Sequence, residues 1–156
     1  MLAEACAWAA SRNQTLYQLL IEIYQHYGLY KESLLSLTRK GKEGAEEISQ
    51  MMISYRTNPP ETINRQNVVL IKDYLEQKEK DIVNKTEKTI SLNKSDVLQF
   101  FLADGSKITV RPSGTEPKIK YYFSVKAELP DPAKYDEVNL SVDNKINAII
   151  SAMNLK

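Results

Sequence analysis

The sequence predicts an α+β fold, in which an antiparallel sheet carries helices packed on one face and a helical hairpin comes before the sheet. Three patterns support this prediction. Apolar and polar residues alternate in several short runs, which is the period of a half-buried strand. Two longer segments, residues 45–55 and 142–153, carry apolar side chains at helical spacing. The first 28 residues are helical in period, and we expect them to make few contacts with the sheet.

The N-terminal hairpin, residues 1–28, contains two predicted helices. In the first helix, apolar residues recur at helical spacing, and we expect the thiol of Cys6 to be buried among them. The segment Thr15–Gln18 has the spacing of a capping box and opens the second helix, which Gly28 is expected to end. The predicted apolar stripe of this second helix consists of Leu16, Leu19, Leu20 and Ile23.

The next segment predicts a strand followed by a helix. Leu35 and Leu37 alternate with polar residues, which is typical of a strand with one buried face. The tetrapeptide Gly41-Lys42-Glu43-Gly44 predicts a loop, because glycine is unfavourable inside helices. The helix that follows is expected to end before Asn58-Pro59-Pro60. Its apolar stripe consists of Ala45, Ile48, Met52 and Tyr55.

Short strands fill the middle of the chain. Residues 68–71 form a continuous apolar run, which predicts a buried strand. Residues 76–94 are rich in Lys, Glu, Asp and Asn, and we expect a solvated hairpin there. Two further strands, residues 97–103 and 107–110, are joined through Asp104-Gly105, a dipeptide that favours a type I′ hairpin turn.

The last predicted strand shows the clearest alternation. Its apolar face consists of Ile119, Tyr121, Phe123 and Val125, and its other face consists of Lys120, Tyr122, Ser124 and Lys126. Lys118 and Lys120 therefore project away from the apolar face. Pro130-Asp131-Pro132 ends this pattern, and a closing helix follows with its apolar side on the sheet. The apolar side of that helix consists of Val142, Ile146, Ile149, Ile150 and Met153.

The loop before this strand, Arg-Pro-Ser-Gly-Thr-Glu-Pro-Lys at 111–118, suits an anion. Gly114 lacks a Cβ, so the backbone can bend and an anion can approach closely. We expect the N–H groups of Ser113, Gly114 and Thr115 to converge on the anion, with Arg111 adding a bidentate fork. No Gly-Lys-Ser/Thr ending is present and a strand follows, which excludes the Walker and Rossmann loops. The alternative is a tight, solvated hairpin loop that binds nothing.

This loop, entered from residues 104–110 and continued through 118–122, resembles the phosphate-binding loop of the α-D-phosphohexomutases, in the phosphoglucomutase/phosphomannomutase branch. In that family the loop lies in the fourth, C-terminal domain. The resemblance implies that residues 29–156 form this phosphate-binding domain and that residues 1–28 are the tail of the third. The residues implied to bind the substrate phosphate are Arg111, Ser113, Gly114, Thr115 and Lys120.

Lys120 departs from the family pattern, since many members carry Arg at this position. Lysine still binds phosphate but lacks the planar fork of arginine. The alternative for Lys120 is an ordinary exposed strand lysine. We expect Lys118 to face solvent and Glu116 to shape the loop, because no metal motif or second acid accompanies Glu116.

The resemblance implies a parent enzyme that interconverts hexose 1-phosphate and hexose 6-phosphate by intramolecular phosphotransfer. Such a parent needs Mg²⁺ and a phosphoserine, and this sequence has neither the serine motif nor an Asp-x-Asp-x-Asp spacing. We therefore expect no catalytic residue, no metal ligand and no bound cofactor in this chain, and no activity from it alone. The expected partners are a hexose phosphate and the remaining domains of the parent. His26 is expected to be a surface or packing residue.

The composition argues against nucleic-acid binding and membrane association. A formal net charge of +1 and a pI near 7.7 give no field that would recruit nucleic acid or a membrane. No apolar run is long enough to span a bilayer, and Cys6 alone cannot form an internal disulfide, so we expect a cytoplasmic setting. The alternative to the mutase domain is a stand-alone anion-binding or protein-interaction module of α+β fold.

Overall fold

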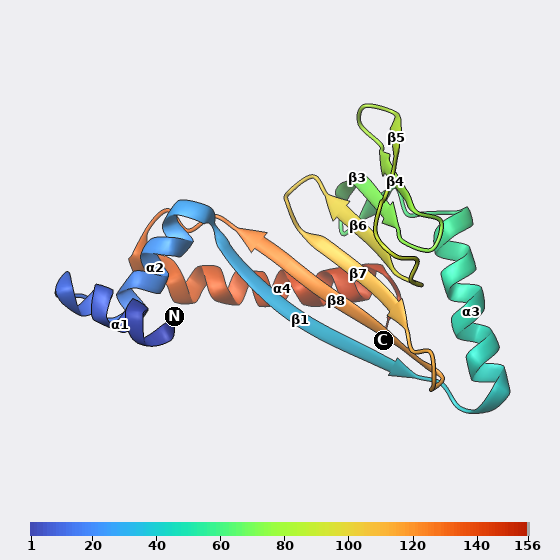
Figure 1. Ribbon diagram of the computed structural model, residues 1–156, viewed down its shortest axis with the longest axis horizontal. Helices are drawn as coiled ribbons and strands as arrows, with labels where there is room; N and C mark the ends of the chain where they lie inside the picture. The colour runs from blue at the N-terminus through green and yellow to red at the C-terminus, as the bar shows by residue number, and fades with distance from the viewer. Residues whose placement is uncertain (156) are drawn as a thin grey trace.

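The computed structural model describes residues 1–155, which form four α-helices, one 3₁₀ helix and eight strands (Figure 1). The helices are α1 (Leu2–Ser11), α2 (Leu16–Tyr27), α3 (Gly41–Thr57), η1 (Pro132–Lys134) and α4 (Tyr135–Ala152). The strands are β1 (Leu29–Thr38), β2 (Thr62–Ile63), β3 (Gln66–Asp73), β4 (Lys78–Asp81), β5 (Thr86–Thr89), β6 (Leu98–Leu102), β7 (Lys107–Pro112) and β8 (Lys118–Ala127). No helix of this described part is both long and apolar enough to cross a membrane.

The strands form one antiparallel sheet in the order β1-β8-β7-β6-β3-β4-β5, and β2 pairs with β3 beside this path. β1 and β8 pair in register over ten residues, from Leu29 opposite Ala127 to Thr38 opposite Lys118. β4 and β5 form the solvated hairpin predicted between residues 76 and 94, and every residue of β5 is exposed. The predicted α+β architecture is confirmed.

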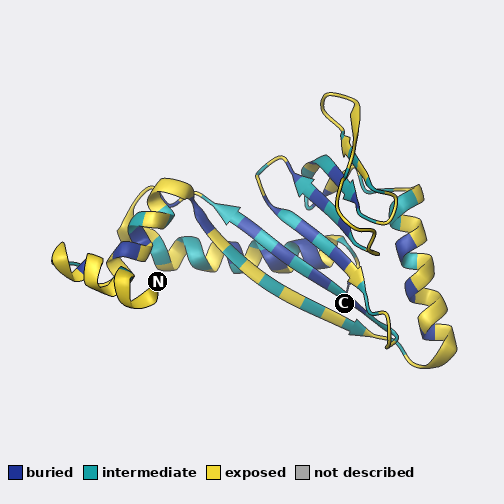
Figure 2. Ribbon diagram, viewed as in Figure 1, coloured by how far each residue is buried: buried dark blue, intermediate teal, exposed yellow. Residues whose placement is uncertain are grey.

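One face of the sheet is the core, and helices α3 and α4 cover it (Figures 1 and 2). The alternation predicted for the last strand is confirmed, because every second residue of β8 is buried and points to the helices. Tyr55 of α3 packs edge-on against Phe100 and Tyr121 of the sheet. The most deeply buried residues of the sheet are Phe100, Ile108, Val110, Ile119, Tyr121, Phe123 and Val125.

The predicted loop at Gly41–Gly44 is wrong, because these residues form the first turn of α3. Gly44 is buried, and a Cβ built there would lie 2.5 Å from the Cβ of Arg39. The glycine therefore permits the preceding chain to pass close to the helix. Gly41 has a φ of +69°, a conformation that glycine adopts without strain.

The turn at Asp104-Gly105 joins the predicted strands but is not type I′. Gly105 has a φ of +82°, whereas Asp104 is not in the positive region. The Gly105 N–H donates to the Leu102 carbonyl, and the Leu102 N–H donates to the Ser106 carbonyl. This is a three-residue loop with a type I turn and a glycine in the left-handed position.

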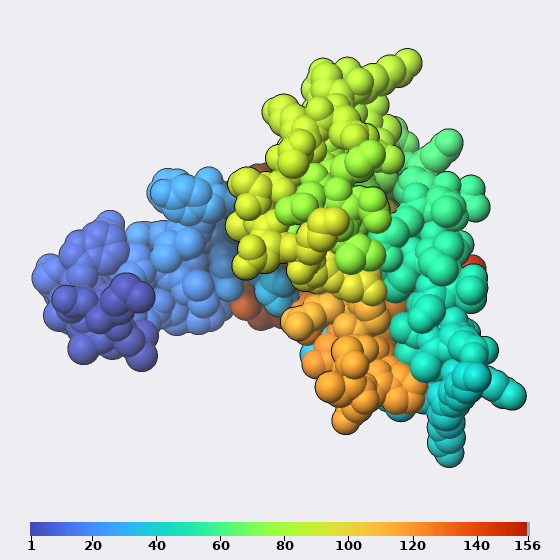
Figure 3. Space-filling view, turned by 45° about the vertical axis from the view of Figure 1, so that its right-hand side comes forward, coloured from blue at the N-terminus to red at the C-terminus, as the bar shows by residue number. Residues whose placement is uncertain are grey.

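The N-terminal hairpin lies at one end of the molecule (Figure 3). The capping box of α2 is present, and Gly28 ends the helix as predicted. Of the predicted apolar stripe, Leu19 is buried as expected, whereas Leu16, Leu20 and Ile23 are exposed. The second buried residue of α2 is Ile21, which the prediction did not include. Cys6 is exposed, so the expectation of a buried thiol is also wrong, since α1 packs against little besides α2.

The contacts between the hairpin and the rest of the chain include two aromatic pairs. The ring of Tyr24 stacks on that of Tyr135 at 6.1 Å, and the ring of Tyr17 meets the same residue edge-on at 5.9 Å. The main core begins at Leu29, and Tyr24 packs at its margin. A domain boundary between residues 28 and 29 stays a prediction.

Candidate functional site

The candidate site is built where β7 and β8 end at a five-residue loop, Ser113–Pro117. Arg111 and Lys120 are direct cross-strand partners. Their neighbours Val110 and Ile119 are buried in the core, so strand alternation places Arg111 and Lys120 on the face that the helices leave free. Partners in this position have Cβ atoms about 5 Å apart. The sheet therefore places two cationic side chains side by side.

The loop and these two residues enclose a surface depression of about 260 Å³. It is lined by Arg111, Pro112, Ser113, Gly114, Thr115 and Lys120. The structure thus brings together all five residues that the sequence predicts as phosphate ligands. The loop and β8 reach the surface beside the start of α3, where the orange and cyan atoms meet in Figure 3.

The two cations of this depression have no acidic partner within 4 Å among residues 1–155. Lys118 differs from them, because its Nζ lies 2.8 Å from the Glu116 carboxylate. The hydrogen bond and charge of Lys118 lower the pKa of Glu116, and Lys120 adds a smaller effect in the same direction. The acid of the loop is thus paired with Lys118, and the charges of Arg111 and Lys120 remain uncompensated.

The expected convergence of three free backbone N–H groups is wrong, because the N–H groups of Ser113 and Thr115 both have acceptors inside the loop. The Ser113 N–H donates to the Lys118 carbonyl at 2.7 Å, because Pro112 lacks an N–H and Ser113 is the next donor that can close the hairpin. The Ser113 hydroxyl accepts long hydrogen bonds from the N–H groups of Thr115 and Glu116, at 3.5 and 3.4 Å. Among residues 1–155, the Gly114 N–H has no acceptor.

The backbone conformation at Gly114 does not require a glycine, although the sequence suggested that the loop bends there. Its φ is not in the left-handed region, so the backbone conformation is open to other residues. A Cβ built on Gly114 would meet no atom within 4 Å. The space beside this residue is therefore open to a ligand.

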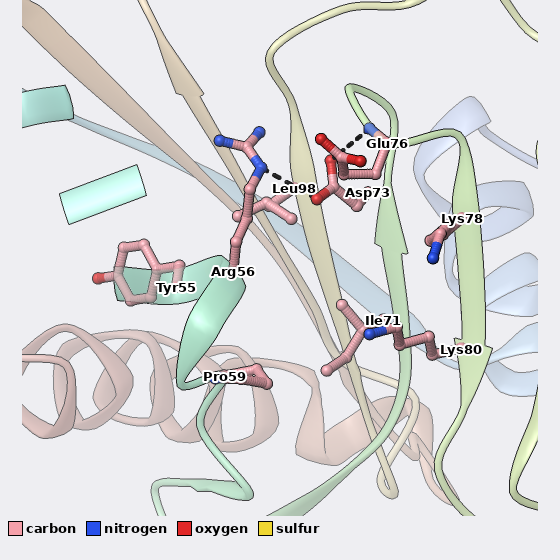
Figure 4. A pocket seen from close by; sticks show the side chains of 9 residues that line it. All are labelled: Tyr55, Arg56, Pro59, Ile71, Asp73, Glu76, Lys78, Lys80 and Leu98. Atoms are coloured by element: carbon pink, nitrogen blue, oxygen red, sulfur yellow. Dashed lines mark hydrogen bonds and ion pairs between the residues drawn. The ribbon is translucent and has the colours of Figure 1, made fainter. Parts of the chain in front are cut away.

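A second hollow, of about 150 Å³, lies at the C-terminal end of α3 (Figure 4). Three cations line this hollow, and among residues 1–155 one of them, Lys80, has no ion pair. Arg56 is bound by two carboxylates, with Nε 2.9 Å from Asp73 and Nη2 2.5 Å from Asp96. The rim residue Lys78 pairs with Glu87 at 3.2 Å. This hollow therefore offers less free positive charge than the Arg111 depression.

Metal chemistry finds little support in the described part of the chain. Among residues 1–155, no three His, Cys, Asp or Glu side chains are grouped as a metal ion would need. The side chains present do not fit Mg²⁺. His26 is exposed near the end of α2, with its ring edge-on to Tyr27 at 6.4 Å.

The fold and the depression define an α+β domain with a cationic loop site. The chain belongs to the family described as the phosphoglucomutase/phosphomannomutase C-terminal domain, which matches residues 65–145. This match includes β3 to β8 and the whole loop. It does not separate the phosphoglucomutase branch from the phosphomannomutase branch.

Individual relatives agree with this family. Phosphoglucomutases of Staphylococcus aureus strains N315 and MRSA252 are each 39% identical over 137 residues, which is 88% of this chain and 23% of theirs. The open form of pp63/parafusin, a phosphoglucomutase from Paramecium, matches 90% of this chain and 23% of its own with a TM-score of 0.52. At 17% identity, the parafusin likeness supports the fold alone. The chain spans about a quarter of the length of these proteins.

Proposed function

We propose that this chain binds the phosphate group of a hexose phosphate, as the C-terminal domain of a phosphohexomutase. The proposed ligands are Arg111, Ser113, Gly114, Thr115 and Lys120. The observation that carries the proposal is the pairing of Arg111 with Lys120 across two strands, with no acidic group of residues 1–155 within 4 Å of either charge. Two adjacent cations repel one another, so the arrangement favours an anion between them.

The donors around the depression suit a phosphate dianion. Arg111 offers a planar fork, and Lys120 offers a compact charge. The Ser113 oxygen accepts hydrogen bonds inside the loop, so its own hydrogen is available for a ligand. The open space at Gly114 lets a phosphate oxygen approach its N–H group.

In the proposed mutase, this site holds the phosphate that does not react. A substrate that presents each end in turn to one catalytic centre needs the same grip in both half-reactions, and binding far from the reacting atoms supplies orientation. The parent would interconvert hexose 1-phosphate and hexose 6-phosphate, with Mg²⁺ and a phosphoserine supplied outside this chain. The remaining domains of that parent are its proposed partners, and a cytoplasmic location stays a prediction.

The test is calorimetric titration of the purified chain with glucose 6-phosphate. We expect millimolar affinity, about 4 kcal/mol, because this chain supplies only part of the substrate site. Arg111→Ala and Lys120→Ala should each weaken binding, the former about 10- to 100-fold because a charge-assisted contact is lost. Lys94→Ala is the matched control, since Lys94 is exposed and forms no ion pair within residues 1–155. Equal affinities for Arg111→Ala and Lys94→Ala would contradict the proposal.

A second candidate is a protein-interaction module. The observation in its favour is that most exposed large apolar side chains lie in residues 1–34, among them Trp8, Tyr17, Tyr27 and Leu34. A module of this kind would show no response to glucose 6-phosphate in the same titration. The two candidates are therefore separated by one experiment.

A further inference from the structure

We propose that Thr109 donates a hydrogen bond to an oxygen of the sugar whose phosphate is held by Arg111 and Lys120, and that Gln99 and Tyr74 position Thr109 as a donor. This inference rests on the proposed function and adds a sugar subsite to it. The subsite would make the domain prefer a hexose phosphate over a smaller phosphate ester. Its residues lie on the face of the sheet that the helices leave free.

Strand register places Thr109 next to the cation pair. Thr109 precedes Arg111 by two residues on β7, so both side chains project on the same face about 6.6 Å apart along the strand. Its cross-strand partner is Tyr122, which follows Lys120 by two residues on β8. The Thr109–Tyr122 pair therefore forms the next row of the sheet after the Arg111–Lys120 pair. A pyranose ring attached to a bound phosphate extends over a distance of this order.

A chain of hydrogen bonds sets the direction in which Thr109 can donate. The Tyr74 hydroxyl donates to Gln99 Oε1 at 3.0 Å, which turns the amide nitrogen of Gln99 toward β7. Gln99 Nε2 then donates to Thr109 Oγ1 at 3.2 Å. Because Thr109 Oγ1 accepts this bond, its own hydrogen is left to donate. Among residues 1–155, no acceptor takes it.

The residues of this hydrogen-bond network are partly buried, which limits the groups that could accept a hydrogen bond from Thr109. Tyr74, Gln99, Thr109 and Tyr122 are each intermediate in exposure. A partly buried hydroxyl hydrogen without an acceptor costs free energy unless water or a ligand meets it. A sugar hydroxyl or ring oxygen satisfies it, and the ring of Tyr122 offers an apolar surface beside it.

The experiment compares the dissociation constants of the chain for glucose 6-phosphate and for methyl phosphate, which carries the same charge without a sugar. We expect wild type to prefer the hexose phosphate by roughly three- to tenfold, the gain from one hydrogen bond. In Thr109→Val the ratio of the two constants should fall toward one, and in Thr109→Ser it should be retained. Tyr74→Phe should also lower the ratio, because the Gln99 amide becomes free to turn and accept from Thr109.

The possible results separate this inference from the proposed function. A ratio that is unchanged in both Thr109→Val and Tyr74→Phe would overturn the sugar subsite while leaving the phosphate site in place. Tyr74→Phe keeps the inference testable if Thr109→Val does not fold, since it leaves Thr109 itself unaltered. Absence of binding of either ligand to wild type would instead overturn the proposed function. Lys94→Ala, outside both sites, should give the wild-type ratio.

Discussion

Arg111 and Lys120 carry the same charge but present different donors to a ligand. Lys120 offers one ammonium group, whereas a guanidinium at this position would offer a fork directly opposite that of Arg111. We therefore expect Lys120→Arg to bind glucose 6-phosphate more tightly, by about 1 kcal/mol, the value of an added charge-assisted hydrogen bond. Calorimetric titration measures the change, with Lys94→Arg as the same substitution outside the site. A loss of affinity in Lys120→Arg would show that the depression does not hold an anion between these two strands.

Gly114 and Gly44 make a matched pair of glycine-to-alanine tests. At Gly114 the added methyl group meets nothing, so the free energy of unfolding should stay the same or rise by up to about 1 kcal/mol. The methyl group would occupy the proposed ligand space, so affinity for phosphate should fall. At Gly44 it would lie 2.8 Å from the backbone carbonyl carbon of Arg39, and we expect a loss of about 1–3 kcal/mol in stability.

Urea denaturation and phosphate titration of both glycine variants check this prediction. Gly44 does not line the depression, but the N–H of its close neighbour Arg39 donates to the Pro117 carbonyl of the loop at 2.8 Å, so Lys94→Ala remains the control for binding. Undiminished binding in Gly114→Ala would show that the open space beside Gly114 is not used by the ligand.

The sequence alone predicted only part of the proposed phosphate site. Alternation along β8 was enough to place Lys120 on the free face, and the glycine and arginine of the loop pointed to an anion. The role of the Ser113 N–H depends on its pairing with the Lys118 carbonyl, which local sequence does not reveal. Thr109 and Gln99 were missed because their connection requires the register of β6 against β7.

At the scale of elements, α3 is held to the sheet by Arg56. Its side chain is 16% exposed and that of Asp73 is 13% exposed, and Arg56 is the one cation within 4 Å of Asp73 among residues 1–155. Arg56→Ala would leave Asp73 buried without its partner, and we expect a loss of about 3–5 kcal/mol in unfolding free energy. Lys42→Ala breaks the exposed pair of Lys42 and Glu46 within the same helix and should cost less than 1 kcal/mol. Similar losses for both variants in urea denaturation would contradict this role for Arg56.

The β6–β7 turn is tied to α4 by Asp104, whose carboxylate lies 2.7 Å from Lys145 Nζ. Burial raises the pKa of Asp104, but the hydrogen bonds from Lys145 and Ser106 outweigh it, and the pKa is lowered overall. A lowered pKa in the folded state means that the carboxylate stabilises the fold above the unfolded pKa near about 4. That contribution is lost as the pH falls through the folded pKa.

We therefore expect Asp104→Asn to lower the melting temperature at pH 7, and the difference from wild type to shrink as the pH falls below about 4. Thermal melts across this range measure it. Glu32→Gln, at an exposed position of β1 that has no ion pair among residues 1–155, should show little difference at any pH. A gap between Asp104→Asn and wild type that stayed constant down to pH 2 would contradict the assignment.

The elements themselves were largely predictable, whereas the turns between them were not. The periods of two and 3.6 residues located most of the strands and the helices, because burial on one face imposes them. Gly44 was interpreted as a helix breaker. The structure shows instead that a glycine is needed at this position because Arg39 packs closely against it. The two-residue turn between β2 and β3 consists of Asn64 and Arg65, and both have a positive φ. This turn was not predicted, because its sequence is neither Asp-Gly nor Asn-Gly.

At the scale of the whole molecule, the N-terminal hairpin and the cationic loop lie at opposite ends of the β1–β8 pair (Figure 1). Ten paired residues separate them, which is about 33 Å of strand. The hairpin therefore contributes nothing to the phosphate site.

The proposed function places the phosphoserine and the Mg²⁺ site in other domains, so we expect that this chain alone does not convert glucose 1-phosphate to glucose 6-phosphate. In a longer protein that contains it, Arg111→Ala should lower kcat as well as kcat/KM, because lost orientation raises the barrier of the chemical step. A coupled assay with Mg²⁺ on both proteins measures this. Turnover by the 156-residue chain would contradict the proposal that this domain binds phosphate while other domains carry out the reaction. A change in KM alone in Arg111→Ala would show that the loop contributes to substrate binding and not to the chemical step.

The most direct test of the phosphate site is a map of backbone amide shifts during titration of the chain with glucose 6-phosphate. We predict saturable shifts at Gly114 and Thr115, and their loss in Arg111→Ala. The Ser113 amide should move less, because its N–H is already bonded to Lys118. Saturable shifts confined to the hollow around Arg56 and Lys80 in Figure 4, with the loop unmoved, would contradict the account.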